Sequence, residues 1–132
     1  MSRTVELVAD RDPQAVACAR CVIADTPWLR LRGLLGKRGL QPGEGLLLRP
    51  ASAIHTLFMR FPIDAVFLDR DLTVVGVAPA LKPWRATGRR GARAVLELPA
   101  GECERRGIHA GDRLRAVPAV QPPATSRRRN TR

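Results

Sequence analysis

The sequence predicts a single β-rich α+β domain, a small and partly closed β-barrel of about seven short strands with one or two short helices. The length of 132 residues allows one modest hydrophobic core. Apolar residues make up 45% of the chain, and they occur in short runs separated by Gly, Pro and Asp. Short apolar runs between turn-forming residues are typical of strands joined by tight connections, so they favour a β-rich fold.

The N-terminal third is predicted to contain two strands and then a helix. Residues 3–9 alternate between apolar and polar side chains, as a half-buried strand does, and residues 20–25 form the second strand. Thr26 can cap the free amides of a helix, and Pro27 loses no hydrogen bond at its first position. Apolar residues then recur at helical spacing, at Trp28, Leu31, Leu34 and Leu35.

The middle of the chain is predicted to form short strands around one hairpin. Residues 63–68 are apolar on both faces, as in a covered sheet or a barrel wall. Residues 69–71 are charged and form the turn, after which residues 73–78 return as the partner strand. Two further strands are expected at residues 46–49 and 52–56.

The C-terminal part is predicted to hold a loop, a helix, two strands and a tail. Residues 79–93 are rich in Pro, Gly and Arg and are expected to be a loop. Residues 99–107 begin with Pro and end with Gly, as short helices do. Strands are expected at residues 94–98 and 114–117. The domain therefore spans residues 1–118, and residues 119–132 form a disordered basic tail rich in Pro and Arg.

The formal net charge of +11 raises the question of nucleic-acid binding. Only Lys37 and Lys82 are lysines, and an excess of Arg beside Ala, Gly and Pro is the bias of a GC-rich coding sequence. Four of the arginines lie in the tail, and the others are dispersed along the chain. We therefore expect no specific nucleic-acid partner and only loose adhesion to polyanions.

Apolar runs and cysteines indicate the compartment. No run approaches the roughly 18 apolar residues of a membrane span, and charges interrupt the N-terminal segment where a signal peptide is apolar. Three cysteines, an odd number, fit a reducing compartment. We expect a cytoplasmic protein without a transmembrane segment.

Residues 54–69 carry the chain's most unusual chemistry, because polar side chains interrupt an otherwise apolar run. His55 can exchange a proton near neutral pH, Asp64 can orient it across the bend at Pro62, and Arg60 can hold an anion. The alternative is a buried His–Asp pair that only satisfies the loop. Ligand-binding candidates are His55, Thr56, Met59, Arg60, Asp64 and Trp84.

The cysteines have the spacing of half a metal site. Cys18 and Cys21 would form a zinc site with Cys103 and either His55 or His109, or they would form a redox pair. However, no second pair has metal spacing, and Cys21 leads into a strand. We therefore expect core cysteines. With no phosphate loop, dinucleotide fingerprint or nucleophile elbow in the sequence, we expect neither a metal nor a cofactor.

Three further residues each have two interpretations. Trp84, followed by Arg85, would stack on a sugar, base or peptide, or it would cover the edge of the core. Glu44 would reach a ligand or shape a turn. Glu97 alternates with apolar neighbours, so it would lie on a solvent face or point inward toward an arginine.

Five blocks in order resemble a small bacterial and archaeal family, domain of unknown function 192. The blocks are Gly33-Leu34, Gly43-Glu44-Gly45, the run from His55 through Met59 and Arg60 to Asp64, Leu96 to Gly101, and Gly107-Ile108 with Gly111-Asp112. The resemblance covers residues 4–117 and implies a compact β-dominated domain with no established activity. Relatives commonly have Gly in the hairpin turn, where this chain has Leu72.

The leading functional hypothesis is a non-catalytic binding or accessory module. Its pocket would lie around His55, Arg60 and Asp64, with Trp28 or Trp84 nearby, and would take a small anionic or polyhydroxylated ligand. A second hypothesis is a small hydrolase or transferase that uses His55 as general base oriented by Asp64. A third is a protein-interaction domain with a basic tail. The oligomeric state is left open.

Overall fold

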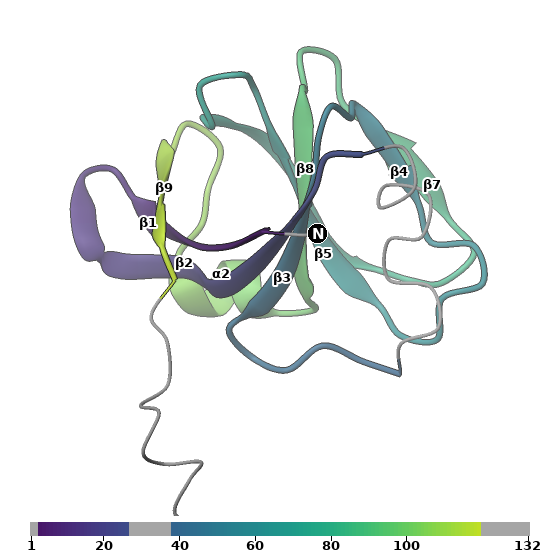
Figure 1. The fold of residues 1–132 in the computed structure, drawn as a ribbon. Coiled ribbons are helices and arrows are strands. Elements are labelled where there is room, and N and C mark those ends of the chain that lie inside the picture. The colour runs from purple at the N-terminus through teal and green to yellow at the C-terminus, as the bar shows by residue number, and fades with distance from the viewer. Residues whose placement is uncertain (1–2, 27–37, 120–132) are drawn as a thin grey trace, which may run out of the picture.

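The computed structural model describes residues 3–26 and 38–119, which form nine strands and one helix (Figure 1). The elements are β1 (Arg3–Ala9), β2 (Asp12–Ala24), β3 (Glu44–Leu48), β4 (Ala53–His55), β5 (Ile63–Leu68), β6 (Val74–Leu81), β7 (Ala86–Gly88), β8 (Ala94–Pro99), α2 (Glu102–Arg106) and β9 (Leu114–Pro118). Trp28 with its expected helix, and residues 120–132 of the expected tail, lie outside the described ranges. No helix within those ranges is long and apolar enough to cross a bilayer.

Seven strands form one sheet, in the order β6-β5-β8-β3-β2-β1-β9, and β4 pairs with β7 in a second sheet. Only β2 and β3 are parallel neighbours, and the other pairs are antiparallel. This confirms the β-rich class but corrects the expected barrel. In the described part of the chain, the edges of the large sheet are joined by one isolated bridge, Thr73 to Arg113, and by no continuous ladder.

The core lies on both faces of the large sheet, because the interior strands β5 and β8 bury the side chains on both of their faces. Leu96 and Leu98 belong to a cluster on one face, together with Cys103 of α2. Val95 belongs to the cluster on the other face, together with Met59 from the segment after β4. Helix α2 and the β4–β5 connection therefore contribute to opposite faces.

Most expected strands shift by a few residues, and three segments differ more strongly from the sequence expectations. The β2 strand starts at Asp12 rather than at residue 20, because its polar beginning pairs with β1 through a tight hairpin. The expected loop at residues 79–93 contains the end of β6 and all of β7. The expected helix at residues 99–107 is shortened to α2, which has Gly101 and Gly107 in left-handed conformations at its two ends.

The β5–β6 hairpin forms as expected, although Leu72 occupies a turn position that favours glycine. Leu72 adopts a φ of 64°, a conformation that non-glycine residues rarely adopt. The Asp69 carboxylate holds the turn by accepting hydrogen bonds from the amides of Asp71, at 2.8 Å, and Thr73, at 3.0 Å. Leu72 also packs against the core, which helps to retain this conformation.

Candidate functional site

Thr56 organises the region that the sequence marks as a site. It follows β4 and is fully buried. Its hydroxyl donates to the Lys82 carbonyl at 2.6 Å and accepts from the Arg85 amide at 2.9 Å. Its carbonyl accepts from the amides of Met59, at 3.2 Å, and Trp84, at 2.9 Å. Thr56 therefore fixes the segment after β4 against the segment before β7.

His55 and Arg60 are exposed on this region. The His55 Nδ1 atom accepts a hydrogen bond of 3.3 Å from the Leu57 amide. Arg60 has no ion-pair partner among the residues that the structure describes. Met59, which lies between His55 and Arg60 in the sequence, is buried and packs in the same cluster as Ile63. The two polar candidates thus face water, whereas Met59 belongs to the core.

Asp64 is buried and has a different set of partners. One oxygen accepts from the Ala80 amide at 2.8 Å, and the other accepts from the amides of Gly101, at 3.1 Å, and Cys103, at 2.9 Å. Within residues 3–26 and 38–119, no hydrogen bond joins Asp64 to His55. Asp64 instead connects β5 to the end of β6 and to the start of α2.

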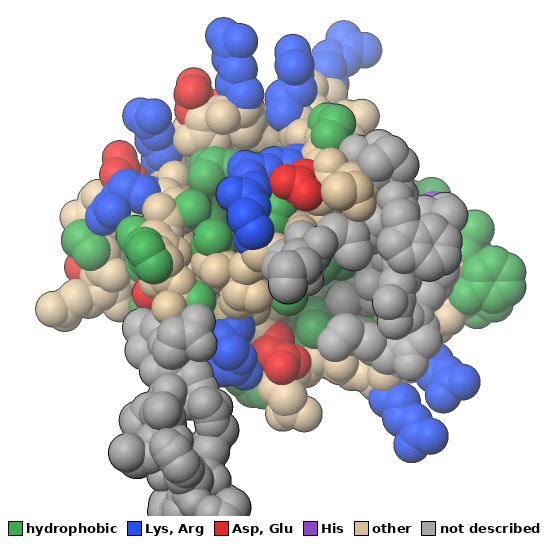
Figure 2. Space-filling view, in the orientation of Figure 1, with side chains coloured by type: hydrophobic (Ala, Val, Ile, Leu, Met, Phe, Trp, Pro, Cys, Tyr) green, Lys and Arg blue, Asp and Glu red, His purple; other side chains and the backbone are tan. Residues whose placement is uncertain are grey.

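Trp84 stacks against Phe58, which the sequence did not single out. The two ring centroids lie 4.7 Å apart at an interplanar angle of 60°. Both side chains remain open to water, with 67% of Phe58 and 56% of Trp84 exposed. Figure 2 shows hydrophobic side chains projecting from the β4–β7 side of the molecule, on the right. We call Phe58 and Trp84 the aromatic pair.

The aromatic pair also has an unusual backbone. Phe58 has a φ of 66° and Trp84 a φ of 65°, so both occupy the left-handed region. Such conformations are strained for bulky side chains, and they cluster at functional sites. Register explains the pairing: Ile54 lies opposite Thr87 and His55 opposite Ala86, so the β4–β7 pair brings the flanking segments together.

Three cationic side chains lie within two residues of Phe58 or Trp84 in the sequence. Arg60, Lys82 and Arg85 are exposed, and none has a carboxylate partner in the described part of the chain. The Arg85 guanidinium donates only a weak hydrogen bond, 3.4 Å long, to the Trp84 carbonyl. These groups are available to an anionic partner.

The cysteines are buried thiols. Among the described residues, no group of three or more His, Cys, Asp or Glu side chains is placed to hold a metal ion. A hydrogen bond with Cys18, together with burial, raises the pKa of the Cys21 thiol. Burial and the nearby Asp64 carboxylate raise the pKa of Cys103 to about 12. Both thiols are therefore protonated at neutral pH and are poor nucleophiles.

Glu44 and Glu97 lie in different environments. Glu44 shapes a turn: it accepts from the Gln41 amide at 2.8 Å and lies 3.6 Å from Arg20. Glu97 points inward and is only 4% exposed, yet no described residue bonds to its carboxyl group. Burial raises the pKa of Glu97 to about 8. The Glu97 carboxyl group is therefore mostly protonated in the folded protein at neutral pH and below.

Glu102 is a buried carboxylate that the sequence did not reveal. It accepts hydrogen bonds from Arg106, at 2.8 Å, from Arg105, and from the Gly43 amide at 3.2 Å. Burial would raise the pKa of this carboxyl group, but the hydrogen bonds and the charges of Arg106 and Arg105 outweigh it and lower the pKa. The spacing of Glu102 to Arg106 on a helix was the available signal.

The sequence matches one known protein family over most of its length. The model of the family described as Uncharacterized ACR, domain of unknown function 192, matches residues 8–116. The chain belongs to this family. The match confirms the resemblance seen in the sequence blocks, and the family description assigns no activity.

Relatives of this family member occur among archaea. A UPF0127 protein of Pyrococcus furiosus is 41% identical over 64 residues, which cover 48% of this chain and 54% of that protein. A UPF0127 protein of Thermococcus sibiricus is 33% identical over 100 residues, covering 72% of this chain and 64% of that protein. The chain thus spans less than two thirds of the length of either relative.

Two crystal structures share the fold of this family member. One is a Sinorhizobium meliloti 1021 protein named for a suggested role in transcription regulation; it has a TM-score of 0.75 and 24% identity, with 88% of this chain and 94% of that chain covered. The other is a protein of unknown function from Novosphingobium aromaticivorans, with a TM-score of 0.72, 23% identity, and coverage of 86% and 84%. At this identity the likeness concerns the fold alone.

Proposed function

We propose that this protein is a non-catalytic binding module whose binding surface is the aromatic pair. The observation that carries the proposal is that Phe58 and Trp84 stay largely in water while holding left-handed backbone conformations. Each such conformation costs about 1–2 kcal/mol for a residue with a side chain. Because the rings are exposed, core burial does not offset this cost. A role in recognition explains why both aromatic residues are held there.

The ligand class follows from the side chains that surround the pair. Aromatic faces take the flat or apolar faces of rings, and the exposed cations Arg60, Lys82 and Arg85 attract anionic oxygens. The exposed His55 ring is held by the hydrogen bond that its Nδ1 atom accepts from the Leu57 amide. We therefore infer a polyhydroxylated ligand that carries acidic groups, such as an acidic oligosaccharide.

Catalysis by His55 has less support than binding. A general base needs its orienting group within hydrogen-bond reach, but three backbone amides occupy the oxygens of Asp64. The Nδ1 atom of His55 accepts from the Leu57 amide instead. This geometry favours a binding module over a hydrolase or transferase that uses this pair.

Titration calorimetry of the full chain tests the proposal. The probes are an oligogalacturonate, a neutral oligosaccharide of equal length and a single-stranded oligonucleotide. We expect the oligogalacturonate to bind most tightly, and we expect Trp84→Ala and Phe58→Ala each to weaken it about tenfold, the equivalent of 1.4 kcal/mol. Trp84→Phe keeps an aromatic face and should retain part of the affinity.

Charge variants distinguish a direct contact with the ligand from general electrostatic attraction to the protein. Arg85→Gln should weaken binding of the oligogalacturonate more than Arg11→Gln, which removes the same charge from the β1–β2 turn. Equal affinity for wild type and Trp84→Ala would overturn the proposal. So would tight binding of the oligonucleotide with none of either oligosaccharide.

A further inference from the structure

A separate pocket lies at one end of the large sheet and contains none of the residues discussed as a site above. It has a volume of about 390 Å³, within the range of small-molecule pockets. Eight residues line it: Asp25, Arg49, Pro50, Asp69, Arg70, Leu72, Arg93 and Ala94. Three arginines thus share one small cavity.

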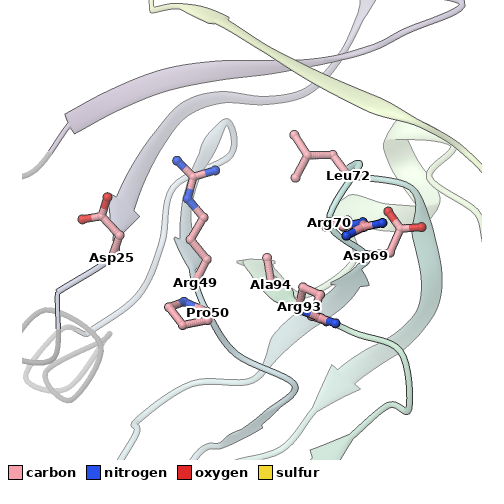
Figure 3. A pocket seen from close by; sticks show the side chains of 8 residues that line it. All are labelled: Asp25, Arg49, Pro50, Asp69, Arg70, Leu72, Arg93 and Ala94. Atoms are coloured by element: carbon pink, nitrogen blue, oxygen red, sulfur yellow. The ribbon is translucent and has the colours of Figure 1, made fainter.

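Strand order brings these residues together. The central strands are ordered β5-β8-β3-β2, with β8 antiparallel to both β5 and β3, and with β2 parallel to β3. The carboxyl ends of β2, β3 and β5 therefore meet the amino end of β8. Asp25 follows β2, Arg49 follows β3, Arg70 lies in the turn after β5, and Arg93 precedes β8. Figure 3 shows Asp25 and Arg49 on one side of the pocket and Arg70 and Arg93 on the other.

The arginines of the pocket lack anionic partners. Within the described ranges, none of Arg49, Arg70 and Arg93 forms an ion pair. The two acidic residues of the lining are already engaged elsewhere. Asp25 pairs with Arg3 at 3.2 Å, and Asp69 accepts the two amides of its own turn. Asp69 keeps its negative charge, so the three guanidinium groups outnumber the two carboxylates of the lining and leave the pocket with a net positive charge.

The backbone that presents the arginines is fixed by hydrogen bonds. The Arg49 amide donates to the Ala24 carbonyl at 3.1 Å, and the Arg93 amide donates to the Leu68 carbonyl at 2.7 Å. The Arg93 carbonyl accepts from the Ala51 amide at 3.0 Å. A prearranged wall lowers the entropic cost of holding a ligand.

We infer that this pocket binds a small organic anion with two or more negative charges, a phosphate ester or a polycarboxylate. Guanidinium groups bind the oxygens of both groups bidentately. Pro50, Leu72 and Ala94 supply apolar surface for the body of such a ligand. This inference does not depend on the aromatic pair.

Calorimetric titration of the full chain with pyrophosphate and with citrate tests the inference, at constant ionic strength set with sodium chloride. We expect saturable binding of at least one of them, and the preferred probe identifies the anionic group. Arg49→Gln and Arg93→Gln should each weaken that binding about tenfold or more, because each removes a charge-assisted hydrogen bond.

Arg11→Gln is the matched control, because it removes one positive charge from an exposed turn outside the pocket. It should leave the affinity within about twofold of wild type, since exposed distant charges are screened by salt. Circular dichroism checks that both pocket variants fold, and exposed Arg93 gives a variant with little structural risk. Equal losses for Arg11→Gln and Arg93→Gln, or no saturable binding by wild type, would overturn the inference.

Discussion

A single hydroxyl group holds the segment around Trp84 in place. Thr56 is the buried residue whose hydroxyl bonds both the Lys82 carbonyl and the Arg85 amide, on either side of Trp84. If the hydroxyl is lost, these two backbone groups lose their partner, and an unsatisfied buried group costs about 1–3 kcal/mol. The geometry of Trp84 therefore depends on Thr56.

We predict that Thr56→Val destabilises the protein by about 2 kcal/mol, although the side chain keeps its shape. Thr56→Ser retains the hydroxyl and should lose less than half as much. Urea unfolding followed by circular dichroism measures both free energies. A Thr56→Val protein as stable as wild type would show that Lys82 and Arg85 find other partners.

Residue chemistry could be predicted for some of this site and not for the rest. Trp84 and Thr56 stood out because polar and aromatic residues are unexpected in their segments. Phe58 did not, because a Phe beside Met59 has the composition of an ordinary core segment. Its exposure follows from the left-handed backbone at Phe58 and from the β4–β7 register. Neither is visible in a local pattern.

At the scale of elements, Glu102 fastens helix α2 to the sheet. Its carboxylate accepts from Arg106 and from the Gly43 amide before β3, and Arg106 also donates to the Val16 carbonyl of β2 at 3.0 Å. The helix is only five residues long, too short to be stable through its own hydrogen bonds. Its position therefore depends on these contacts and on the burial of Cys103.

Glu102→Gln should lower the free energy of unfolding by about 2 kcal/mol at pH 7, because Arg106 and the buried Gly43 amide lose a charged acceptor. Glu104→Gln is the matched control, since it makes the same charge change on an exposed residue of the same helix. That variant should stay within about 0.5 kcal/mol of wild type. Similar urea midpoints for the two variants would contradict this role of Glu102.

Elements with a strong local pattern were predictable. Residues 3–9 alternate and residues 63–68 are apolar except for Asp64, and the structure has strands with those bounds. The first half of β2 and the whole of β7 were missed. Asp12, Pro13 and Gln14 show no apolar alternation, and β7 is the small segment Ala86–Gly88. These strands exist because a partner supplies hydrogen bonds, so propensity alone does not reveal them.

Considered as a whole molecule, the chain shows why barrel closure was a wrong expectation. Closure depends on which strands form the edges, and strand order is a long-range property. Here β6 and β9 are the edges, and Thr73 and Arg113 form the isolated bridge between their ends. The partners of Asp64 could not be predicted from the sequence for the same reason. Its amide partners come from residues 80, 101 and 103, which only the fold brings together.

Two buried carboxyl groups, Glu97 and Glu102, make the free energy of unfolding depend on pH, and the two dependences have opposite signs. The lowered pKa of Glu102 means that its contribution is present above the ordinary value of 4.5 and is lost as the pH falls. Glu97, flanked by Leu46 and Ala65 on the neighbouring strands, has a pKa raised to about 8. Its contribution is fully present below pH 4.5 and is lost as the pH rises toward 8.

We therefore predict that the domain loses stability between pH 5 and pH 8, and that Glu97→Gln removes most of this loss. One proton held by the native state changes the free energy of unfolding by at most about 1.4 kcal/mol per pH unit. Gln cannot ionise, so the variant should match wild type near pH 5 and exceed it at pH 8. Urea unfolding at pH 5, 6.5 and 8 gives both curves, with Glu104→Gln as the exposed control. Parallel curves for wild type and Glu97→Gln would mean that Glu97 ionises normally in the folded protein.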